Sequence, residues 1–145
     1  MPSQFTMTRR VAFSETDLAG IVHFANFYRY MEDAEHAFYR SLGFSVHPSE
    51  AEIGWPRVKA SCDFRLPLRF EEEFEVQVLV AEVRSKAVRY RFHIWKNEPR
   101  ALAAVGEMVV VCVNLTGEKM QAVAIPDFWK SQLEPAAPDL LDNAQ

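Results

Sequence analysis

Hydrophobic residues repeat with two different periods along the chain. Between residues 24 and 42 they recur every three or four positions, which predicts one long and largely buried helix. The positions on its apolar face are Phe24, Phe27, Met31, Ala34, Phe38 and Leu42. Asn26 is a candidate cap for the start of this helix, and Gly43 stands where a glycine commonly ends one.

The remaining apolar segments have the pattern of strands. Residues in them alternate between apolar and polar, or are apolar on both faces as in an interior strand. The predicted strands are 5–13, 58–65, 74–83, 87–95 and 101–114. One strand, one buried helix and four further strands predict an α+β fold, with the helix packed against a single antiparallel sheet. We expect one domain over residues 1–133, followed by a loosely ordered tail over 134–145 that is rich in Pro, Ala and Asp.

One helix covers only one face of such a sheet. The alternation places Leu79, Ala81 and Trp95 on the opposite face, which would leave them exposed in a lone subunit. Exposed apolar surface of this kind usually meets a partner. The sequence therefore predicts a homodimer or a homotetramer.

Composition narrows the classes of function. The chain has 145 residues and a net charge of -4, so nothing in its overall charge favours a nucleic-acid partner. The longest apolar run, Ala101–Val113, is interrupted by Glu107 and is shorter than the roughly 20 residues of a membrane span. The four histidines lack metal-ligand spacing. We expect a cytoplasmic protein with no metal site.

The candidate chemistry lies just before the predicted helix. Asp17 precedes Gly20 by three residues, and the helix follows at once. Helix N-termini present unpaired N–H groups and the positive end of the helix dipole, which can polarise a carbonyl oxygen. A carboxylate held beside such a terminus has the equipment for acyl transfer or hydrolysis. The alternative is that Asp17 only forms the turn ahead of the helix, a place where Asp is favoured.

Three motifs in this order resemble a known family. They are Thr16-Asp17-x-x-Gly20-x-Val22, the segment 62–70 with its Pro-containing turn, and the basic segment 84–89. Together they are similar to the hotdog-fold acyl-CoA thioesterases of the 4-hydroxybenzoyl-CoA thioesterase family, over about residues 5–113. The resemblance implies one long central helix wrapped by a five-stranded antiparallel sheet.

The resemblance also implies site residues. Asp17 matches the family's catalytic carboxylate, and the backbone N–H groups at about His23 and Phe24 would polarise the thioester oxygen. The dimer would place the CoA arm across the subunit boundary, and no separate cofactor is implied because CoA is part of the substrate. The residues expected to contact substrate or CoA are Gly20, Val22, Tyr28, Trp55, Arg84, Lys86 and Arg89.

Several roles stay open at this stage. His23 is either catalytic or a residue of the pocket wall or the subunit interface. Trp55 is either a lid over the acyl group or an interface anchor. The basic residues of segment 84–89 either bind CoA phosphates or form a solvated face. Glu32 and Glu35 are either ordinary helix residues or, as in some hotdog enzymes, the catalytic carboxylate.

The reaction leaves alternatives as well. Asp17 can act as a general base or as a nucleophile, and the thioester can be carried by CoA or by an acyl carrier protein. The leading hypothesis is hydrolysis to the free acid and CoA. The alternatives are a non-catalytic hotdog protein that binds an acyl ligand or only assembles, and a hotdog dehydratase, which the surroundings of His23 fit poorly.

Overall fold

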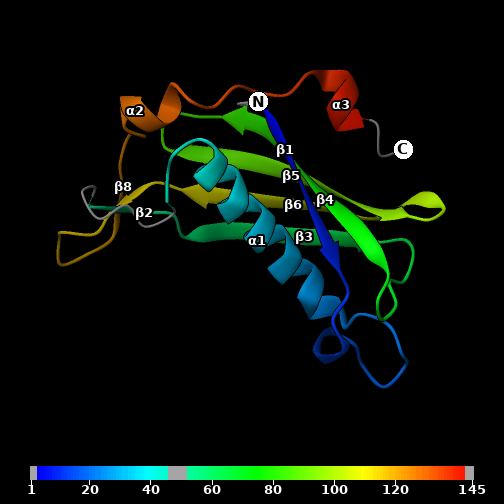
Figure 1. Cartoon of the computed structure of the whole chain (residues 1–145). Coiled ribbons are helices and arrows are strands. Elements are labelled where there is room, and N and C mark those ends of the chain that lie inside the picture. Colours follow the sequence, from blue (N-terminus) through cyan, green and yellow to red (C-terminus); the bar gives the residue numbers. More distant parts are fainter. Residues whose placement is uncertain (1–2, 46–51, 143–145) are drawn as a thin grey trace.

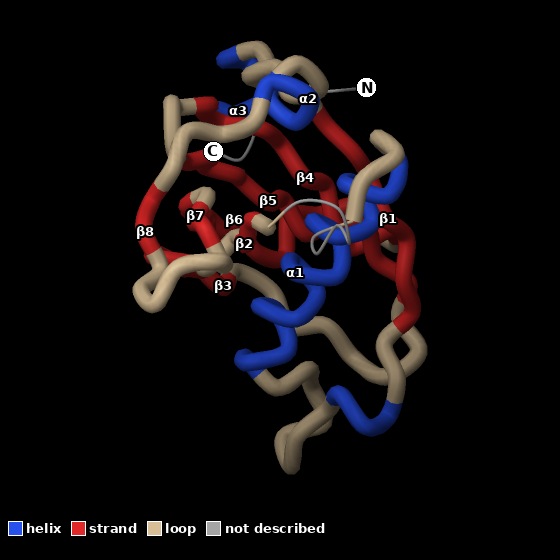
Figure 2. The backbone as a smooth tube through the Cα atoms, turned by 90° about the vertical axis from the view of Figure 1, so that its left-hand side faces the viewer, coloured by secondary structure: helices blue, strands red, loops and turns tan. Residues whose placement is uncertain are grey.

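The computed structural model describes residues 3–45 and 52–142; residues 46–51 of the predicted loop after the helix lie outside this range. Five antiparallel strands form a sheet in the order β1-β4-β5-β6-β3, and α1 crosses one face of it (Figure 1). The bounds are β1 (Gln4–Arg10), α1 (Phe24–Ser41), β3 (Arg57–Phe64), β4 (Glu73–Val83), β5 (Ala87–Asn97) and β6 (Arg100–Val111). The predicted fold class, one long helix wrapped by a five-stranded antiparallel sheet, is confirmed (Figure 2).

Short elements lie around this frame. A small second sheet has the order β2-β7-β8. The short elements are the 3-10 helix η1 (Phe13–Glu15), β2 (Ile53–Gly54), β7 (Val113–Asn114), β8 (Gln121–Ala122), α2 (Asp127–Lys130) and α3 (Pro138–Asp142). The predicted strand 101–114 is thus divided, because the chain leaves β5 at Cys112 and its next two residues pair with β2 and β8 instead. No helix of the described residues has the length and apolar character to cross a membrane.

The ends of α1 follow from local hydrogen bonding. His23 is the N-cap, and its Nδ1 accepts a hydrogen bond of 3.2 Å from the Ala25 N–H. The prediction that Asn26 caps the helix is wrong, because Asn26 lies inside α1 and its side chain donates to the Glu15 carbonyl oxygen at 2.8 Å. The predicted stop at Gly43 is confirmed, since Gly43 follows the helix with a φ of 87° that other residues rarely adopt.

The core lies between α1 and the sheet. Met31, Ala34 and Phe38 of the predicted apolar face are fully buried. Alternate residues of β4 and β5 face them from the sheet, among them Val76, Val78, Tyr90 and Phe92. Gly106 of β6 lies directly under Met31, and a Cβ atom at this glycine would overlap the Met31 sulfur. The absence of a side chain at Gly106 therefore lets the helix sit close to the sheet.

The C-terminal segment lies against β4 and β5. The Ala136 N–H donates to the Val80 carbonyl at 2.7 Å, and Arg91 Nη1 donates to the Leu141 carbonyl at 3.0 Å. Leu79, which the pattern predicts to be exposed in a lone subunit, is fully buried. That prediction is wrong because α3 packs against β4. Within the predicted tail, residues 134–142 are the described part, and they follow the sheet in this way.

Candidate active site

Asp17 lies in a tight turn between η1 and α1. Its Oδ1 accepts a hydrogen bond from the Ala19 N–H at 2.9 Å, and its carbonyl accepts from the Gly20 N–H at 3.0 Å. Gly20 has a φ of 81°, which explains why a glycine stands there. Oδ2 receives no hydrogen bond from any described residue. One carboxylate oxygen thus orients the side chain, and the other remains available.

The turn is joined to both the helix and the sheet. The Asp17 N–H donates to the Ile21 carbonyl at 2.8 Å, and Ile21 forms a β-bridge with Arg69. Val22 is buried, and its N–H donates to the Leu68 carbonyl at 2.8 Å. These contacts fix Asp17 relative to the start of β4 and the first residue of α1.

Glu15 connects the turn to α1. Its carbonyl oxygen accepts from the His23 N–H at 2.9 Å and from the Asn26 side chain at 2.8 Å. Its carboxylate accepts from the buried Tyr30 hydroxyl at 2.9 Å and pairs with Arg9 at 2.8 Å. Burial raises the pKa of Tyr30, and the Glu15 carboxylate raises it further by a smaller amount. The hydroxyl therefore stays a hydrogen-bond donor at neutral pH.

The first turn of α1 presents one free donor near Asp17. The His23 N–H donates to Glu15 and the Ala25 N–H to the His23 ring, so neither is available to a ligand. The Phe24 N–H finds no acceptor within residues 3–45 and 52–142. Of the two backbone donors expected from the sequence, the geometry leaves the one at Phe24, at the positive end of the helix dipole.

An apolar cleft of about 360 Å³ opens beside this helix start. Its lining residues are Ile21, Phe24, Phe27, Phe64, Arg65, Leu66 and Pro67. Phe64, at the end of β3, was not predicted as a site residue. The alternation of β3 placed it on the same face as Cys62 but carried no information about which end of α1 it meets. Its ring stands edge-on to Phe27, with centroids 5.2 Å apart at 86°.

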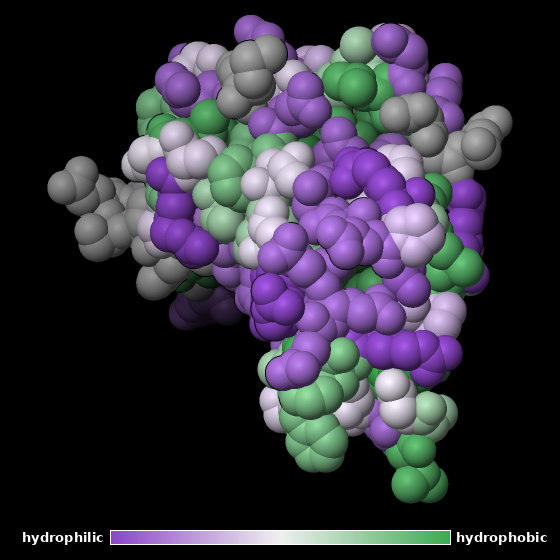
Figure 3. All heavy atoms as spheres, turned by 45° about the vertical axis from the view of Figure 1, so that its right-hand side comes forward, coloured by the Kyte–Doolittle hydropathy of each residue, from purple (hydrophilic) through white to green (hydrophobic). Residues whose placement is uncertain are grey.

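Hydrophobic side chains gather at this end of the molecule. Figure 3 shows them below a mostly hydrophilic face. The segments before α1 and before β4 expose Phe13, Leu18 and Phe70 there, and Leu18 protrudes fully into solvent. Asp17 therefore lies within an apolar surface, although it belongs to an acidic chain.

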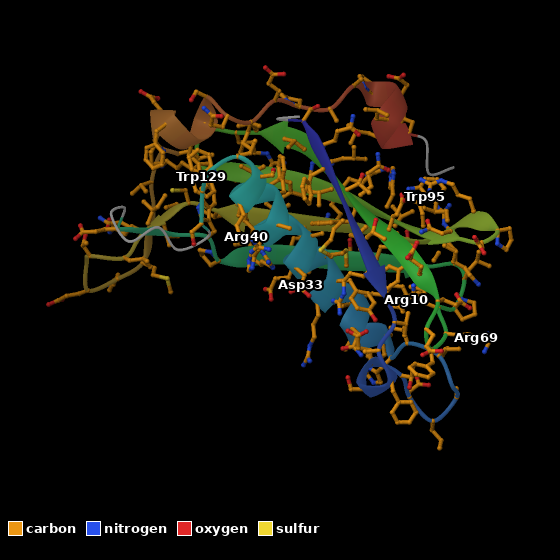
Figure 4. The ribbon with its side chains drawn as sticks, viewed as in Figure 1. Arg10, Asp33, Arg40, Arg69, Trp95 and Trp129 are labelled. Atoms are coloured by element: carbon orange, nitrogen blue, oxygen red, sulfur yellow. The ribbon has the colours of Figure 1, made fainter. Side chains whose placement is uncertain are left out.

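Other predicted site residues lie elsewhere. Trp55 is 8% exposed and packs on Trp129 with centroids 5.2 Å apart, near the C-terminal end of α1. Figure 4 shows Trp129 at the opposite end of the molecule from Arg69, which bridges to the Asp17 turn. Tyr28 lies on α1 and packs partly against the core. In the described subunit Trp55 does not cover the cleft.

The basic segment also lies at the far end. Strand β4 begins shortly after Arg69, which bridges to the Asp17 turn. The 11 residues of β4 span about 33 Å, and Arg84 and Lys86 follow its far end. Arg84 Nε lies 2.9 Å from Glu82 Oε1, and Arg89 Nη1 lies 3.3 Å from Glu107 Oε2. One subunit therefore does not bring Asp17 and these cations together.

A second carboxylate lies inside the C-terminal half of α1. Glu35 is fully buried; its Oε2 accepts a 2.6 Å hydrogen bond from the Tyr39 hydroxyl, and Arg57 Nη1 lies 2.9 Å from Oε1. Burial raises the pKa of Glu35, and the Arg57 charge opposes this shift. Tyr39 also hydrogen-bonds Tyr90 at 3.0 Å. Glu35 lines neither of the two clefts at Arg10 and at Phe24, and its side chain is fully buried and paired, which favours a structural role.

Comparison with known proteins places the chain in a family. The family model of the thioesterase-like superfamily matches residues 11–133. The 4-hydroxybenzoyl-CoA thioesterase of Pseudomonas sp. strain CBS-3 is 23% identical over 134 residues, which cover 87% of this chain and 94% of that protein.

Solved structures agree with this placement. The crystal structure of a 1,4-dihydroxy-2-naphthoyl-CoA thioesterase from Synechocystis superposes with a TM-score of 0.82 at 25% identity, covering 90% of this chain and 95% of that one. A gentisyl-coenzyme A thioesterase superposes with a TM-score of 0.74 at 31% identity, covering 85% of this chain and 97% of that one. The chain therefore belongs to the thioesterase-like superfamily and has its hotdog fold.

Proposed function

We propose that Asp17 and the first turn of α1 carry out the reaction of this protein. As a member of the thioesterase-like superfamily, the protein is an acyl-CoA thioesterase, which hydrolyses a thioester to the free acid and CoA. The proposal rests on the positions of two unpaired groups, a carboxylate oxygen and a backbone N–H. Asp17 Oδ2 and the Phe24 N–H both lack protein partners in the described chain. Phe24 lines the apolar cleft, and so does Ile21, whose carbonyl accepts the hydrogen bond from the Asp17 N–H.

The proposed steps follow from these groups. The thioester oxygen accepts a hydrogen bond from the Phe24 N–H, so the helix dipole stabilises the negative charge of the tetrahedral intermediate. Asp17 either removes a proton from the attacking water or attacks the carbonyl carbon itself. In the second route water then hydrolyses the acyl-aspartyl anhydride. In both routes the C–S bond breaks, CoA leaves as the thiolate, and one water is consumed per thioester. Neither route uses a cofactor or a metal.

We infer that CoA binding needs a second subunit. Arg84, Lys86 and Arg89 would bind the CoA phosphates. Within one subunit, however, Arg84 and Lys86 follow the far end of β4, whose 11 residues span about 33 Å, and Arg89 lies near the start of β5 beside that end. The edge strand β3 is mostly exposed, and Val58 on it is 64% exposed. An edge of this kind readily pairs with another chain. A homodimer or homotetramer formed along β3 would extend the sheet and bring the basic segment of one subunit toward the cleft of the other.

The test is thiol release from a panel of acyl-CoAs, measured for wild type and Asp17→Asn. Asn keeps the size and the turn hydrogen bonds but not the charge, so kcat should fall by about 10²–10⁴ while melting is unchanged. Asp127→Asn is the matched control, because this exposed Asp also begins a helix but lies at the far end. If Asp17→Asn melts normally and keeps more than about a tenth of wild-type kcat, the proposed role of Asp17 is wrong.

A further inference from the structure

We propose that the cleft beside α1 selects an acyl group that is apolar along its whole length, with Phe64 as a specificity-determining residue. This inference rests on the proposed thioesterase function. It concerns which acyl groups the site accepts rather than whether Asp17 performs the chemistry.

The position of the cleft makes it the place for the acyl group. Ile21 lines the cleft, and its carbonyl accepts the hydrogen bond from the Asp17 N–H. Phe24, whose N–H is the proposed oxyanion donor, also lines it. A thioester carbon held between Asp17 and the Phe24 N–H therefore lies beside the cleft, and its acyl substituent can extend along it.

Three phenyl rings shape the cleft. The ring of Phe64 stands edge-on to two rings of α1, at 86° to Phe27 and at 89° to Phe24. Its centroid lies 5.2 Å from that of Phe27 and 6.4 Å from that of Phe24. Aromatic rings favour such edge-to-face contacts, so the three rings support one another from two different elements. Phe64 is still 48% exposed, so part of it remains accessible to a ligand.

The lining has little to offer a polar acyl group. Six of its seven residues are apolar, and the seventh is Arg65. Burial, then the charge of Arg91 and last that of Arg65, lower the pKa of His93, a buried residue of β5, to about 4. Among the described residues that line the cleft, no side chain can accept a hydrogen bond from a ring hydroxyl. Arg65 can donate a hydrogen bond to a hydroxyl oxygen, but the hydroxyl proton loses its water without gaining a side-chain acceptor, which costs roughly tenfold in binding.

The experiment compares matched substrates. We would measure kcat/KM for benzoyl-CoA and 4-hydroxybenzoyl-CoA, and for hexanoyl-CoA and glutaryl-CoA. In each pair the apolar member should be favoured at least about tenfold. Equal or reversed preference in the first pair would overturn the inference. A preference for glutaryl-CoA would instead identify Arg65 as a carboxylate-binding residue and would also overturn it.

Variants assign the preference to Phe64. Phe64→Ala should raise KM for benzoyl-CoA and reduce the benzoyl to 4-hydroxybenzoyl ratio, and Phe64→Leu should restore part of both. Phe128→Ala is the matched control, because Phe128 is 50% exposed but lies on α2, at the other end of the molecule. A ratio unchanged in Phe64→Ala, with normal melting, would contradict the role of Phe64.

Binding separates this inference from the proposed function. Calorimetric titration of Asp17→Asn with both benzoyl-CoAs measures affinity without turnover. If Asp17→Asn binds benzoyl-CoA about tenfold more tightly than 4-hydroxybenzoyl-CoA, but wild type hydrolyses no acyl-CoA, the proposed selectivity of the cleft is supported and the proposed function is refuted. If wild type hydrolyses both compounds and Asp17→Asn binds them with equal affinity, the proposed function is supported and the selectivity of the cleft is refuted.

Discussion

The two ends of α1 each hold a carboxylate, and their surroundings differ in almost every respect. Asp17, before the first turn, is exposed, and one of its carboxylate oxygens has no hydrogen-bond partner among the described residues. Glu35, in the second half, is fully buried and is held by Tyr39 and Arg57. A group that performs chemistry must reach substrate, whereas a buried and paired group contributes to the fold. Accessibility and partner number, more than residue type, separate the two candidates.

The aromatic residues show the same division. At the start of α1, Phe24 and Phe64 leave a cleft between them. At its end Trp129 is fully buried and stacks on Phe44, with centroids 4.5 Å apart, and Trp55 also packs on Trp129. One end is open to a ligand and the other is filled by the chain itself. Substitutions at the two ends should therefore affect activity and stability separately.

The largest effect on stability should come from Arg57→Ala. Removing one partner of a buried ion pair leaves the other charge uncompensated, which costs about 3–5 kcal/mol. Arg57 is one-fifth exposed, so we expect the lower value, about 3 kcal/mol, measured by urea unfolding. The kcat of the folded fraction should stay near that of wild type. A large loss of kcat without loss of stability would mean that this end takes part in the reaction.

Tyr30→Phe should have the next largest effect, on activity. It removes the hydroxyl that donates to Glu15 and so loosens the contact between the Asp17 turn and α1. We expect kcat to fall roughly tenfold with little change in KM, because misplacing a catalytic group by a fraction of an ångström is costly. Asp33→Asn is the control, since it breaks the 3.0 Å pair with Arg9 but spares Glu15. Equal kcat in Tyr30→Phe and wild type would show that this network does not position Asp17.

His23→Ala should have a smaller effect, mainly on stability. The variant loses the helix-capping hydrogen bond from the Ala25 N–H to His23 Nδ1. This should lower the free energy of unfolding by about 1 kcal/mol and Tm by roughly 4 °C. His23→Asn supplies another capping side chain and should restore most of the loss. If both variants melt like wild type, the cap contributes nothing; if both lose kcat more than about tenfold, His23 has a catalytic role.

The smallest effect should be the pH dependence contributed by Glu35. Burial raises its folded-state pKa above the unfolded value, so the folded state retains the proton more strongly. The stability that Glu35 contributes is therefore fully present below the unfolded pKa and is lost as pH rises through the folded pKa. Compared with wild type, Glu35→Gln should become relatively more stable as pH rises from 4 to 7 in thermal melts. A constant difference between the two proteins would contradict this reading.

Most of the fold was predictable because its periodic patterns are long. The helix expected over residues 24–42 is α1, Phe24–Ser41, and the strand expected over 74–83 is β4, Glu73–Val83. The N-cap was not predictable, because His23 and Asn26 both have side chains that can cap. The choice between them depends on the Glu15 carbonyl, which lies 11 residues from Asn26 in the sequence.

The site was predictable only in part. Asp17 and the helix start are local in sequence, so their proximity could be inferred. Phe64 meets Phe27, which is 37 positions earlier in the sequence. Glu35 meets Arg57 of β3 and, through Tyr39, Tyr90 of β5. Such contacts depend on how β3 is placed beside α1, which periodicity does not specify. For the same reason, the distance between Asp17 and Arg84 could not be read from their order in the chain.

The central claim is that the carboxylate at the start of α1 performs the chemistry and the one inside it supports the fold. The most direct test measures kcat and Tm of Asp17→Asn and Glu35→Gln together, with the best acyl-CoA of the panel. We predict that Asp17→Asn loses about 10²–10⁴ in kcat and melts like wild type, whereas Glu35→Gln melts at a changed temperature and keeps kcat within about twofold. The opposite result, with kcat lost in Glu35→Gln and retained in Asp17→Asn, would contradict the account.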